Sequence, residues 1–175
     1  MPQIHVCPLS QIPATVRASG ARSLVTLIND GTPVTRPREI DESRHLFVAM
    51  SDIVLAEEGH VLPAEAHVRQ LLDFVARWDR SEPIVIHCYA GVSRSTAAAF
   101  ITACALNPDR NELAIAQDVR ARSATATPNR LMVEIADRLL AREGRMVEAI
   151  AAIGRGEECF EGVPFALDLI SGPHP

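Results

Sequence analysis

Short apolar runs alternate with longer amphipathic segments in the first half of the chain. The apolar runs occupy residues 4–7, 23–28, 45–50 and 83–88, and they are rich in valine, leucine and isoleucine. Their short length and their lack of a helical period are typical of buried β-strands. The pattern therefore predicts four strands in this half of the chain.

Helical patterns fill most of the remaining sequence. Residues 63–78 repeat apolar positions at the spacing of an amphipathic helix, with a proline in the expected first turn. A second helix is expected to follow Ser93. Asp109 and Glu112 resemble a capping box at the start of a third helix. The helices predicted in the second half of the chain cover residues 109–122, 127–143 and 145–153.

Strands alternate with helices in the first half of the chain, and helices predominate in the second half. This order favours an α/β fold. We expect three layers, in which helices flank a small, mainly parallel central sheet. The chain has 175 residues, of which 47% are apolar, and this is the size of one compact domain. Residues 1–175 are therefore expected to form a single domain, on which a C-terminal tail of residues 154–175 packs and adds at most one strand.

The net charge of the chain and the spread of its charged residues bear on whether it binds nucleic acid or a membrane. The formal net charge is -5, and the 17 Lys and Arg are dispersed among 22 Asp and Glu. A nucleic-acid partner is not expected, because a polyanion requires clustered basic groups. No membrane association is expected, since the uncharged stretch 95–107 is too short to cross a bilayer and the first residues lack the order of a secretion signal. The expected location is cytoplasmic, and the oligomeric state is left open.

The cysteines are widely spaced and form no C-x-x-C pair, which predicts reduced thiols rather than a disulfide framework or a zinc site. Cys7, Cys104 and Cys159 carry no local signal of activation, so we interpret them as packing or incidental residues. Cys88 differs, because it ends the last predicted strand. Ligand sites in open α/β sheets lie beyond the carboxyl ends of the strands.

The stretch VIHCYAGVSRSTAAAF, residues 85–100, places reactive side chains between a predicted strand and a predicted helix. Gly91 permits a bend with positive φ, so that successive backbone N–H groups can point at one centre. The start of the following helix adds positive potential. These features predict an anion-binding loop with the Cys88 sulfur at its base.

Cys88 in such a loop is expected to act as a nucleophile. Helix N-termini and nearby cations can lower a cysteine pKa from about 8.5 to roughly 3.5–7.5, which favours the thiolate. Arg94 is placed to hold two oxygens of a tetrahedral anion with its planar guanidinium. Ser95 can hydrogen-bond the sulfur. The competing interpretation, a core cysteine beside a surface arginine, is disfavoured because the strand, the glycine and the helix all agree with an anion site.

The segment HCYAGVSRS resembles the H-C-x-x-G-x-x-R-S/T signature of the cysteine-dependent protein tyrosine phosphatase superfamily, most closely its compact dual-specificity-like branch. The segments LVTLIND, HLFVAMSDI and TPNRLM follow the order found in that branch. The resemblance implies that Cys88 attacks phosphorus, Arg94 clamps the phosphoryl group, His87 tunes the thiolate and Ser95 assists breakdown of a phosphocysteine. It implies no metal and no cofactor. The implied phosphate-binding amides are those of Tyr89, Ala90, Gly91, Val92, Ser93 and Arg94.

A carboxylic acid is needed to protonate the leaving group and then to activate water. Asp52 follows a predicted strand, begins a long connection that could lie over the pocket, and occupies the acid position of the resembled family, 36 residues before Cys88. Asp30 also follows a strand and is the alternative acid. Asp41 precedes a strand and is expected at the opposite end of the sheet. Asn129 is interpreted as a helix-start residue that supports the loop.

The sequence favours a phosphatase acting on phosphotyrosine or mixed phosphoprotein substrates, and a small phosphate ester stays open as a substrate. Phosphoinositide-selective members of the resembled superfamily tend to carry lysines in this loop, whereas YAGVSR has none, so the resemblance disfavours a polyanionic lipid headgroup. Two other hypotheses remain: a rhodanese-like sulfurtransferase, which also places a cysteine in an anion-binding loop, and a phosphate-binding module without catalytic activity.

Overall fold

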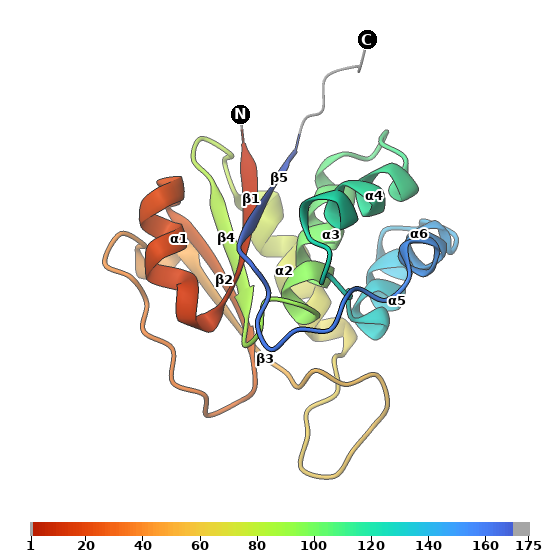
Figure 1. Cartoon of the computed structure of the whole chain (residues 1–175), viewed down its shortest axis with the longest axis horizontal. Helices are drawn as coiled ribbons and strands as arrows, with labels where there is room; N and C mark the ends of the chain where they lie inside the picture. Colours follow the sequence, from red (N-terminus) through yellow and green to blue (C-terminus); the bar gives the residue numbers. More distant parts are fainter. Residues whose placement is uncertain (1, 170–175) are drawn as a thin grey trace.

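One mainly parallel sheet forms the centre of the computed structural model, which describes residues 2–169 (Figure 1). The strand order is β3-β2-β4-β1-β5. The first four strands run parallel, and β5 runs antiparallel to β1. The four strands predicted from apolar runs are confirmed, and the tail adds the fifth. The strands are β1 (Gln3–Pro8), β2 (Ser23–Ile28), β3 (His45–Ala49), β4 (Ile84–Cys88) and β5 (Phe165–Asp168).

Helices cover both faces of the sheet and make the three predicted layers (Figure 1). The first helix packs on one face, against β1 and β4, and the others gather on the opposite face. Two short 3₁₀ turns, Leu9–Gln11 and Glu42–Arg44, precede the first helix and β3. The helices are α1 (Ile12–Ser19), α2 (Glu65–Arg77), α3 (Arg94–Leu106), α4 (Glu112–Arg122), α5 (Arg130–Leu139) and α6 (Arg145–Ile153).

Four helices differ from the sequence-based prediction. Helix α2 begins at Glu65, with Ala64 as its cap, so Pro63 precedes the helix and does not lie in its first turn. Helix α1 was not predicted, because it is short and buries few side chains, so it leaves little periodic signal. Helix α4 is capped by Asn111, whose side chain accepts from the Ala114 N–H at 3.1 Å, and not by Asp109. Helix α5 starts after the predicted residue 127 and ends before residue 143, because Ala141 and Glu143 have positive φ.

Helix α3 determines where the loop of residues 89–93 lies. It packs against β1, β2 and β4, and nearly all of its side chains are buried. Its alanines allow this close approach, because small side chains leave little between the helix and the sheet. The helix begins directly after the carboxyl end of β4, so the loop between them must turn back at that edge of the sheet.

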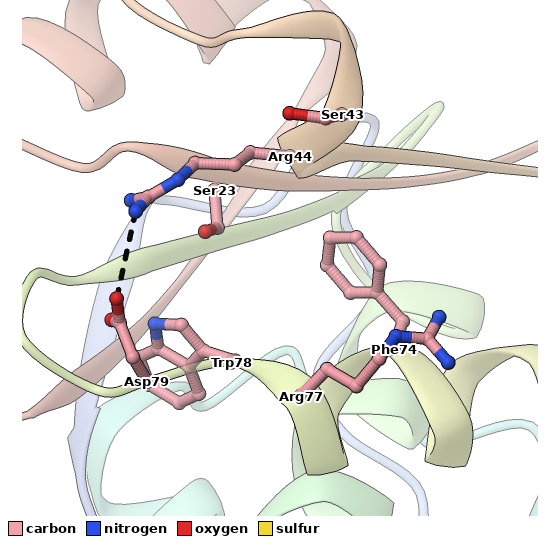
Figure 2. A pocket seen from close by; sticks show the side chains of 7 residues that line it. All are labelled: Ser23, Ser43, Arg44, Phe74, Arg77, Trp78 and Asp79. Atoms are coloured by element: carbon pink, nitrogen blue, oxygen red, sulfur yellow. Dashed lines mark hydrogen bonds and ion pairs between the residues drawn. The ribbon is translucent and has the colours of Figure 1, made fainter.

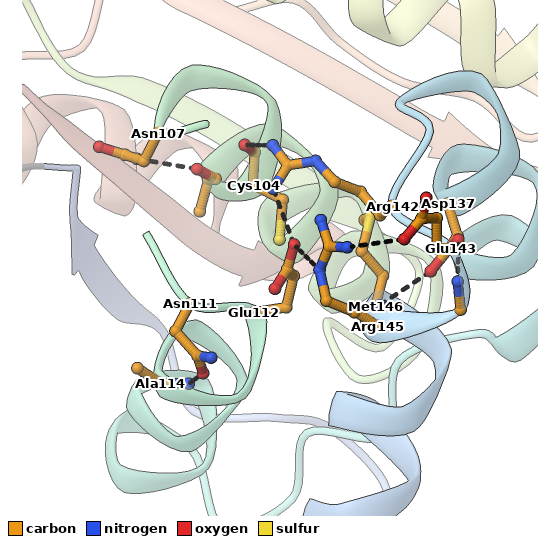
Figure 3. Close-up of polar contacts among 12 residues, drawn as sticks. Cys104, Asn107, Asn111, Glu112, Ala114, Asp137, Arg142, Glu143, Arg145 and Met146 are labelled. Carbon is orange, nitrogen blue, oxygen red and sulfur yellow. Dashed lines mark hydrogen bonds and ion pairs between the residues drawn. The ribbon is translucent and has the colours of Figure 1, made fainter. Parts of the chain in front are cut away.

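A buried polar network ties the later helices together (Figure 3). The Glu112 carboxylate accepts from Arg142 at 2.8 Å and from Arg145 at 3.2 Å. Arg142 also donates to the carbonyl of Cys104 near the end of α3, at 2.7 Å. Asp137 accepts from the backbone N–H of Met146 at 2.8 Å and so caps α6 from a different helix. Burial alone would raise the pKa of Glu112, but its hydrogen bonds from the backbone, Arg142 and Arg145 outweigh burial and lower it.

Of the predicted tail, residues 154–169 pack on the rest of the chain, whereas residues 170–175 lie outside the described residues. We name residues 154–164 the strap. None of the helices within residues 2–169 has the length and apolar character needed to cross a bilayer.

Glu112→Gln is expected to lower the free energy of unfolding by about 3–5 kcal/mol at pH 7, because Arg142 is left buried without a carboxylate. The pKa of Glu112 is lower in the folded than in the unfolded protein, so its contribution is present above about pH 4.3 and is lost as the pH falls through the folded value. Urea unfolding at pH 7 and below pH 4 measures both effects.

The control is Glu134→Gln, which removes an exposed ion pair with Arg130. This substitution is expected to lower the free energy of unfolding by less than about 1 kcal/mol. The role given to this network would be contradicted if both variants lost the same free energy of unfolding. It would also be contradicted if the stability of Glu112→Gln depended on pH as that of the wild type does.

Candidate active site

The loop between β4 and α3, residues 89–93, packs tightly onto the end of β1. Gly91 has a φ of +71°, and a Cβ at this position would lie 2.7 Å from the Pro8 nitrogen and 2.9 Å from the Cys7 carbonyl carbon. A larger residue would therefore be strained by its backbone and would also clash with β1. The bend that the sequence predicts at Gly91 is present.

The carbonyl groups of this loop are bonded to segments outside it. The carbonyls of Tyr89, Ala90, Val92 and Ser93 accept, in that order, from the backbone N–H groups of Leu9 at 3.0 Å, Gly162 at 2.8 Å, Thr127 at 2.9 Å and Asn129 at 3.2 Å. In a trans peptide unit the N–H points opposite to the C=O. The N–H groups that follow these carbonyls therefore face the inside of the loop, an arrangement that suits an anion.

Cys88 lies at the base of this loop. Its side chain is 2% exposed, and its Sγ lies 3.1 Å from the Ser95 Oγ. The Gly91 N–H donates to the same sulfur at 3.3 Å. The sulfur thus receives a main-chain donor from the loop and contacts a hydroxyl from the first turn of α3.

Arg94 is a buried cation, 5% exposed. Its Nη1 donates to the Asn29 Oδ1 at 2.7 Å and to the Met50 carbonyl at 2.8 Å. Its Nε is buried and has no hydrogen-bond partner among the described residues. A buried guanidinium N–H without a partner is costly, and the missing partner is supplied if an anion binds beside it.

Asn29 was not singled out by the sequence analysis, although it directly precedes the candidate Asp30. The signal was available, because Asn29 follows β2 at the same edge of the sheet as Cys88. Asp30 itself is exposed and does not line the cleft around Cys88. The residue that reaches the site from this strand is the amide and not the carboxylate.

His87 is fully buried and faces away from the cleft. Its Nδ1 lies 3.0 Å from the carbonyl of Cys88. Burial lowers the pKa of His87 to about 4, and the positive charge of Arg94 acts in the same direction. The imidazole is therefore neutral at pH 7, so it acts on the site through a hydrogen bond and not through a positive charge.

Asp52 lies on the rim of the same cleft as Cys88. Its Oδ1 accepts from the Ser93 hydroxyl at 2.7 Å and from the Asn129 Nδ2 at 3.0 Å. Asn129 also caps α5 by accepting from the Met132 N–H at 3.1 Å. Asn129 thus joins the carboxylate, the loop and the start of a helix, in agreement with the supporting role inferred from the sequence.

The strap closes one side of the site, a contact that the sequence analysis did not predict. The Gly162 N–H bonds the loop at Ala90, and a Cβ on Gly162 would lie 2.8 Å from the Gly91 carbonyl oxygen. The strap also places Cys159 in the wall of the cleft, which has a volume of about 510 Å³. The other two cysteines outside the site are buried, and burial raises the pKa values of Cys7 and Cys104 to about 12.

A smaller hollow of about 120 Å³ lies at the opposite edge of the sheet, near the start of β2 (Figure 2). Figure 2 shows the ion pair between Arg44 and Asp79 beside it, with atoms 3.5 Å apart. Phe74 and Trp78 form an apolar wall. Among residues 2–169, the lining of this hollow includes no cysteine and no unpaired carboxylate, so the cleft around Cys88 is the candidate active site.

Comparisons with known proteins agree with this geometry. A family model described as "Protein-tyrosine phosphatase" matches residues 58–125. No curated protein matches the sequence. The Cydia pomonella PTP-2 phosphatase is a similar solved structure, with 21% identity over 77% of this chain and 84% of that chain and a TM-score of 0.60.

Two further solved structures are similar at lower identity. DUSP15 has 12% identity over 87% of this chain and 91% of that chain, with a TM-score of 0.60. PTPMT1 in complex with PI(5)P has 13% identity over 84% and 90%, with a TM-score of 0.58. Likeness at these identities is evidence of a shared fold, whereas the family match includes the loop from Cys88 to Arg94. The chain therefore has the fold of dual-specificity phosphatases, and the match over residues 58–125 supports the resemblance of its loop to the cysteine-dependent protein tyrosine phosphatase superfamily.

Proposed function

We propose that the protein hydrolyses phosphate monoesters through a phosphocysteine intermediate. The Cys88 sulfur attacks phosphorus, an S–P bond forms and the ester P–O bond breaks. Water then attacks the phosphocysteine, which releases phosphate and regenerates the thiolate. The observation that carries the proposal is the unpartnered Nε of buried Arg94, beside a loop whose N–H groups face inward. Together they supply donors for the phosphoryl oxygens.

Asp52 is the proposed acid for the leaving group. It shares the cleft with Cys88, whereas Asp30 does not. Both of its hydrogen bonds described above go to Oδ1, which leaves Oδ2 available for the leaving oxygen. After the first step the same carboxylate can take a proton from the attacking water. Ser95 is proposed to stabilise the sulfur as it departs from phosphorus, because its hydroxyl already contacts Sγ.

The surroundings of the cleft support a phosphoprotein substrate. Six of the eight large apolar side chains that are exposed within residues 2–169 lie on segments bordering the cleft: Val54, Leu55, Val61, Tyr89, Phe160 and Val163. Exposed apolar surface around a site is typical of contact with protein. A phosphotyrosine ring or an adjoining peptide side chain would cover part of it.

Charge around the cleft disfavours a substrate with several phosphates. Arg94 is the one cation in its lining, and the proposal assigns it to the reacting phosphoryl group. The bordering segments carry exposed carboxylates, namely Glu57 and Glu58 beside Asp52 and Glu157, Glu158 and Glu161 on the strap. Like charges would repel a second phosphate. PTPMT1, in contrast, has a solved structure in complex with PI(5)P.

The first test separates the phosphatase from the sulfurtransferase and from a binding module without activity. Cys88→Ser is expected to lower kcat for phenyl phosphate by more than about 10³-fold, because serine is a much weaker nucleophile at pH 7. Acid-quenched wild-type protein should carry a phosphoryl group on Cys88 by mass spectrometry. The control Cys104→Ala changes a buried thiol outside the site and should retain activity. Turnover by Cys88→Ser at the wild-type rate would exclude the proposed nucleophile.

The second test concerns the acid. Asp52→Asn is expected to reduce kcat by about 10²-fold or more for phenyl phosphate, whose leaving group requires a proton. The loss should stay below about tenfold for an ester of a strongly acidic phenol, which leaves as an anion. Asp30→Asn serves as the matched control and should change neither rate. Equal losses of Asp52→Asn with both esters would assign the acid role to another group.

The third test concerns the substrate. Phosphotyrosine peptides with lysine on both sides are expected to exceed glutamate-flanked peptides in kcat/KM by roughly 3- to 10-fold at low salt, and the difference should shrink at high salt. Replacing the three strap glutamates with glutamine should further reduce the preference in kcat/KM for the lysine-flanked peptides. A preference for the acidic peptides, or for a soluble inositol polyphosphate, would overturn the substrate class.

A further inference from the structure

A buried threonine connects two histidines behind the active-site loop. Thr26, in β2, is fully buried and lies opposite His87 of β4 in the parallel register. Its Oγ1 is 2.7 Å from the Nε2 of His87 and 2.7 Å from the Nε2 of His45, at the start of β3. Three neighbouring strands thus contribute one continuous line of side chains, which ends at the carbonyl of Cys88.

The direction of each hydrogen bond in this line follows from the chemistry of its ends. A carbonyl oxygen only accepts, so the Nδ1 of His87 must carry the proton that bonds to Cys88 O. The neutral ring then has an unprotonated Nε2, which accepts from the Thr26 hydroxyl. Since that hydroxyl has one proton, its oxygen must accept from the Nε2–H of His45. The line therefore runs from His45 through Thr26 and His87 to the Cys88 carbonyl.

The neutral state of His87 follows chiefly from its burial, which lowers the pKa of the ring although the hydrogen bond to the Cys88 carbonyl acts in the opposite direction. A protonated His87 would donate from both nitrogens, so the Thr26 hydroxyl would have to turn toward the Nε2 of His45 and the direction of that hydrogen bond would reverse. Besides His45, whose charged form acts on His87, the groups that act on this pair of rings are Arg94 near His87 and Arg36 near His45. Both are cations, and both oppose protonation of the ring beside them.

The last bond orients the first peptide unit of the loop. With the carbonyl of Cys88 held toward His87, the N–H of Tyr89 points in the opposite direction, since the peptide unit is trans. The four other carbonyls described above are held outside the loop by backbone groups. The Cys88 carbonyl is held by a side chain, so its orientation depends on the state of that side chain.

We propose that Thr26 is a positioning residue for phosphoryl transfer: its hydroxyl, between His45 and His87, fixes the ring that holds the first peptide unit of the phosphate loop. The inference rests on the proposed phosphatase function. Thr26 does not touch the substrate, and it acts through His87 and the Cys88 carbonyl.

The direct test observes the ring protons. Nitrogen-15 NMR of histidine-labelled wild-type protein should find His87 neutral with the proton on Nδ1 between pH 5 and pH 8, and His45 protonated at Nε2. A proton on the Nε2 of His87, or a titration of His87 within that range, would overturn the proposal. This measurement needs no turnover, so it distinguishes failure of this inference from failure of the proposed function.

The functional test compares three threonine variants. Thr26→Val should lower kcat/KM for phenyl phosphate roughly 2- to 12-fold, the equivalent of one net hydrogen bond, and should move the pH midpoint of Cys88 alkylation by iodoacetamide upward. Thr26→Ser keeps the hydroxyl and should restore both. Thr102→Val is the matched control, because Thr102 is equally buried and donates to the Ala98 carbonyl at 2.7 Å within α3.

Thermal unfolding of all three variants separates positioning from stability. Thr26→Val and Thr102→Val are expected to lose similar stability, but only Thr26→Val should change the alkylation profile. An unchanged profile in Thr26→Val, or the same change in Thr102→Val, would contradict the proposal. If Thr26→Val does not fold, the test rests on Thr26→Ser. An alkylation profile of Thr26→Ser that differs from the wild-type profile would then contradict the proposal.

Discussion

The arrangement of this candidate active site depends on one constraint, which is that four of the five carbonyl groups in the loop of residues 89–93 are hydrogen-bonded to segments outside it. Each such bond sends the next N–H inward, because a trans peptide unit holds its two polar groups in opposite directions. The result is a ring of main-chain donors around the Cys88 sulfur. Arg94 completes the ring with a buried N–H that has no partner among the described residues. An anion is the ligand that satisfies all of these donors together.

Several distant segments maintain this constraint. The 3₁₀ turn after β1, the start of α5 and the strap each supply a backbone N–H to the loop. Asn29, after β2, and the Met50 carbonyl, after β3, orient the guanidinium of Arg94. The fold brings these segments together because the parallel strands end at one edge of the sheet. The helical network around Glu112 contributes indirectly, since it holds together the helices on which the loop and the strap rest.

The parts that sequence could predict are those with a local signal. The bounds of β2 and α6 and the succession of strand, loop and helix around Cys88 follow from apolar runs and one glycine. The position of Asp52 near the cleft follows from its place after β3. Helix α1 was missed, and α4 was assigned the wrong cap, because short helices and cap residues depend on a few side chains whose partners are not visible in the pattern.

Contacts between distant residues could not be predicted in this way. Nothing local to Gly162 indicates that it packs against Gly91, and nothing local to Cys159 indicates that it lines the cleft. The resemblance that identified the signature also found no motif in the tail. Asn29 could have been predicted in part, because it follows β2 at the edge of the sheet where Cys88 lies. It was passed over because the search at that position was for a carboxylate.

The most direct measurement is a crystal structure of the protein with vanadate. The account predicts vanadium bonded to the Cys88 sulfur, oxygens that accept from the Arg94 Nε and from the N–H groups of the loop, and the Asp52 carboxylate beside the oxygen opposite the sulfur. Vanadate bound elsewhere, or a bound vanadate that leaves the Arg94 Nε without a partner, would contradict the account.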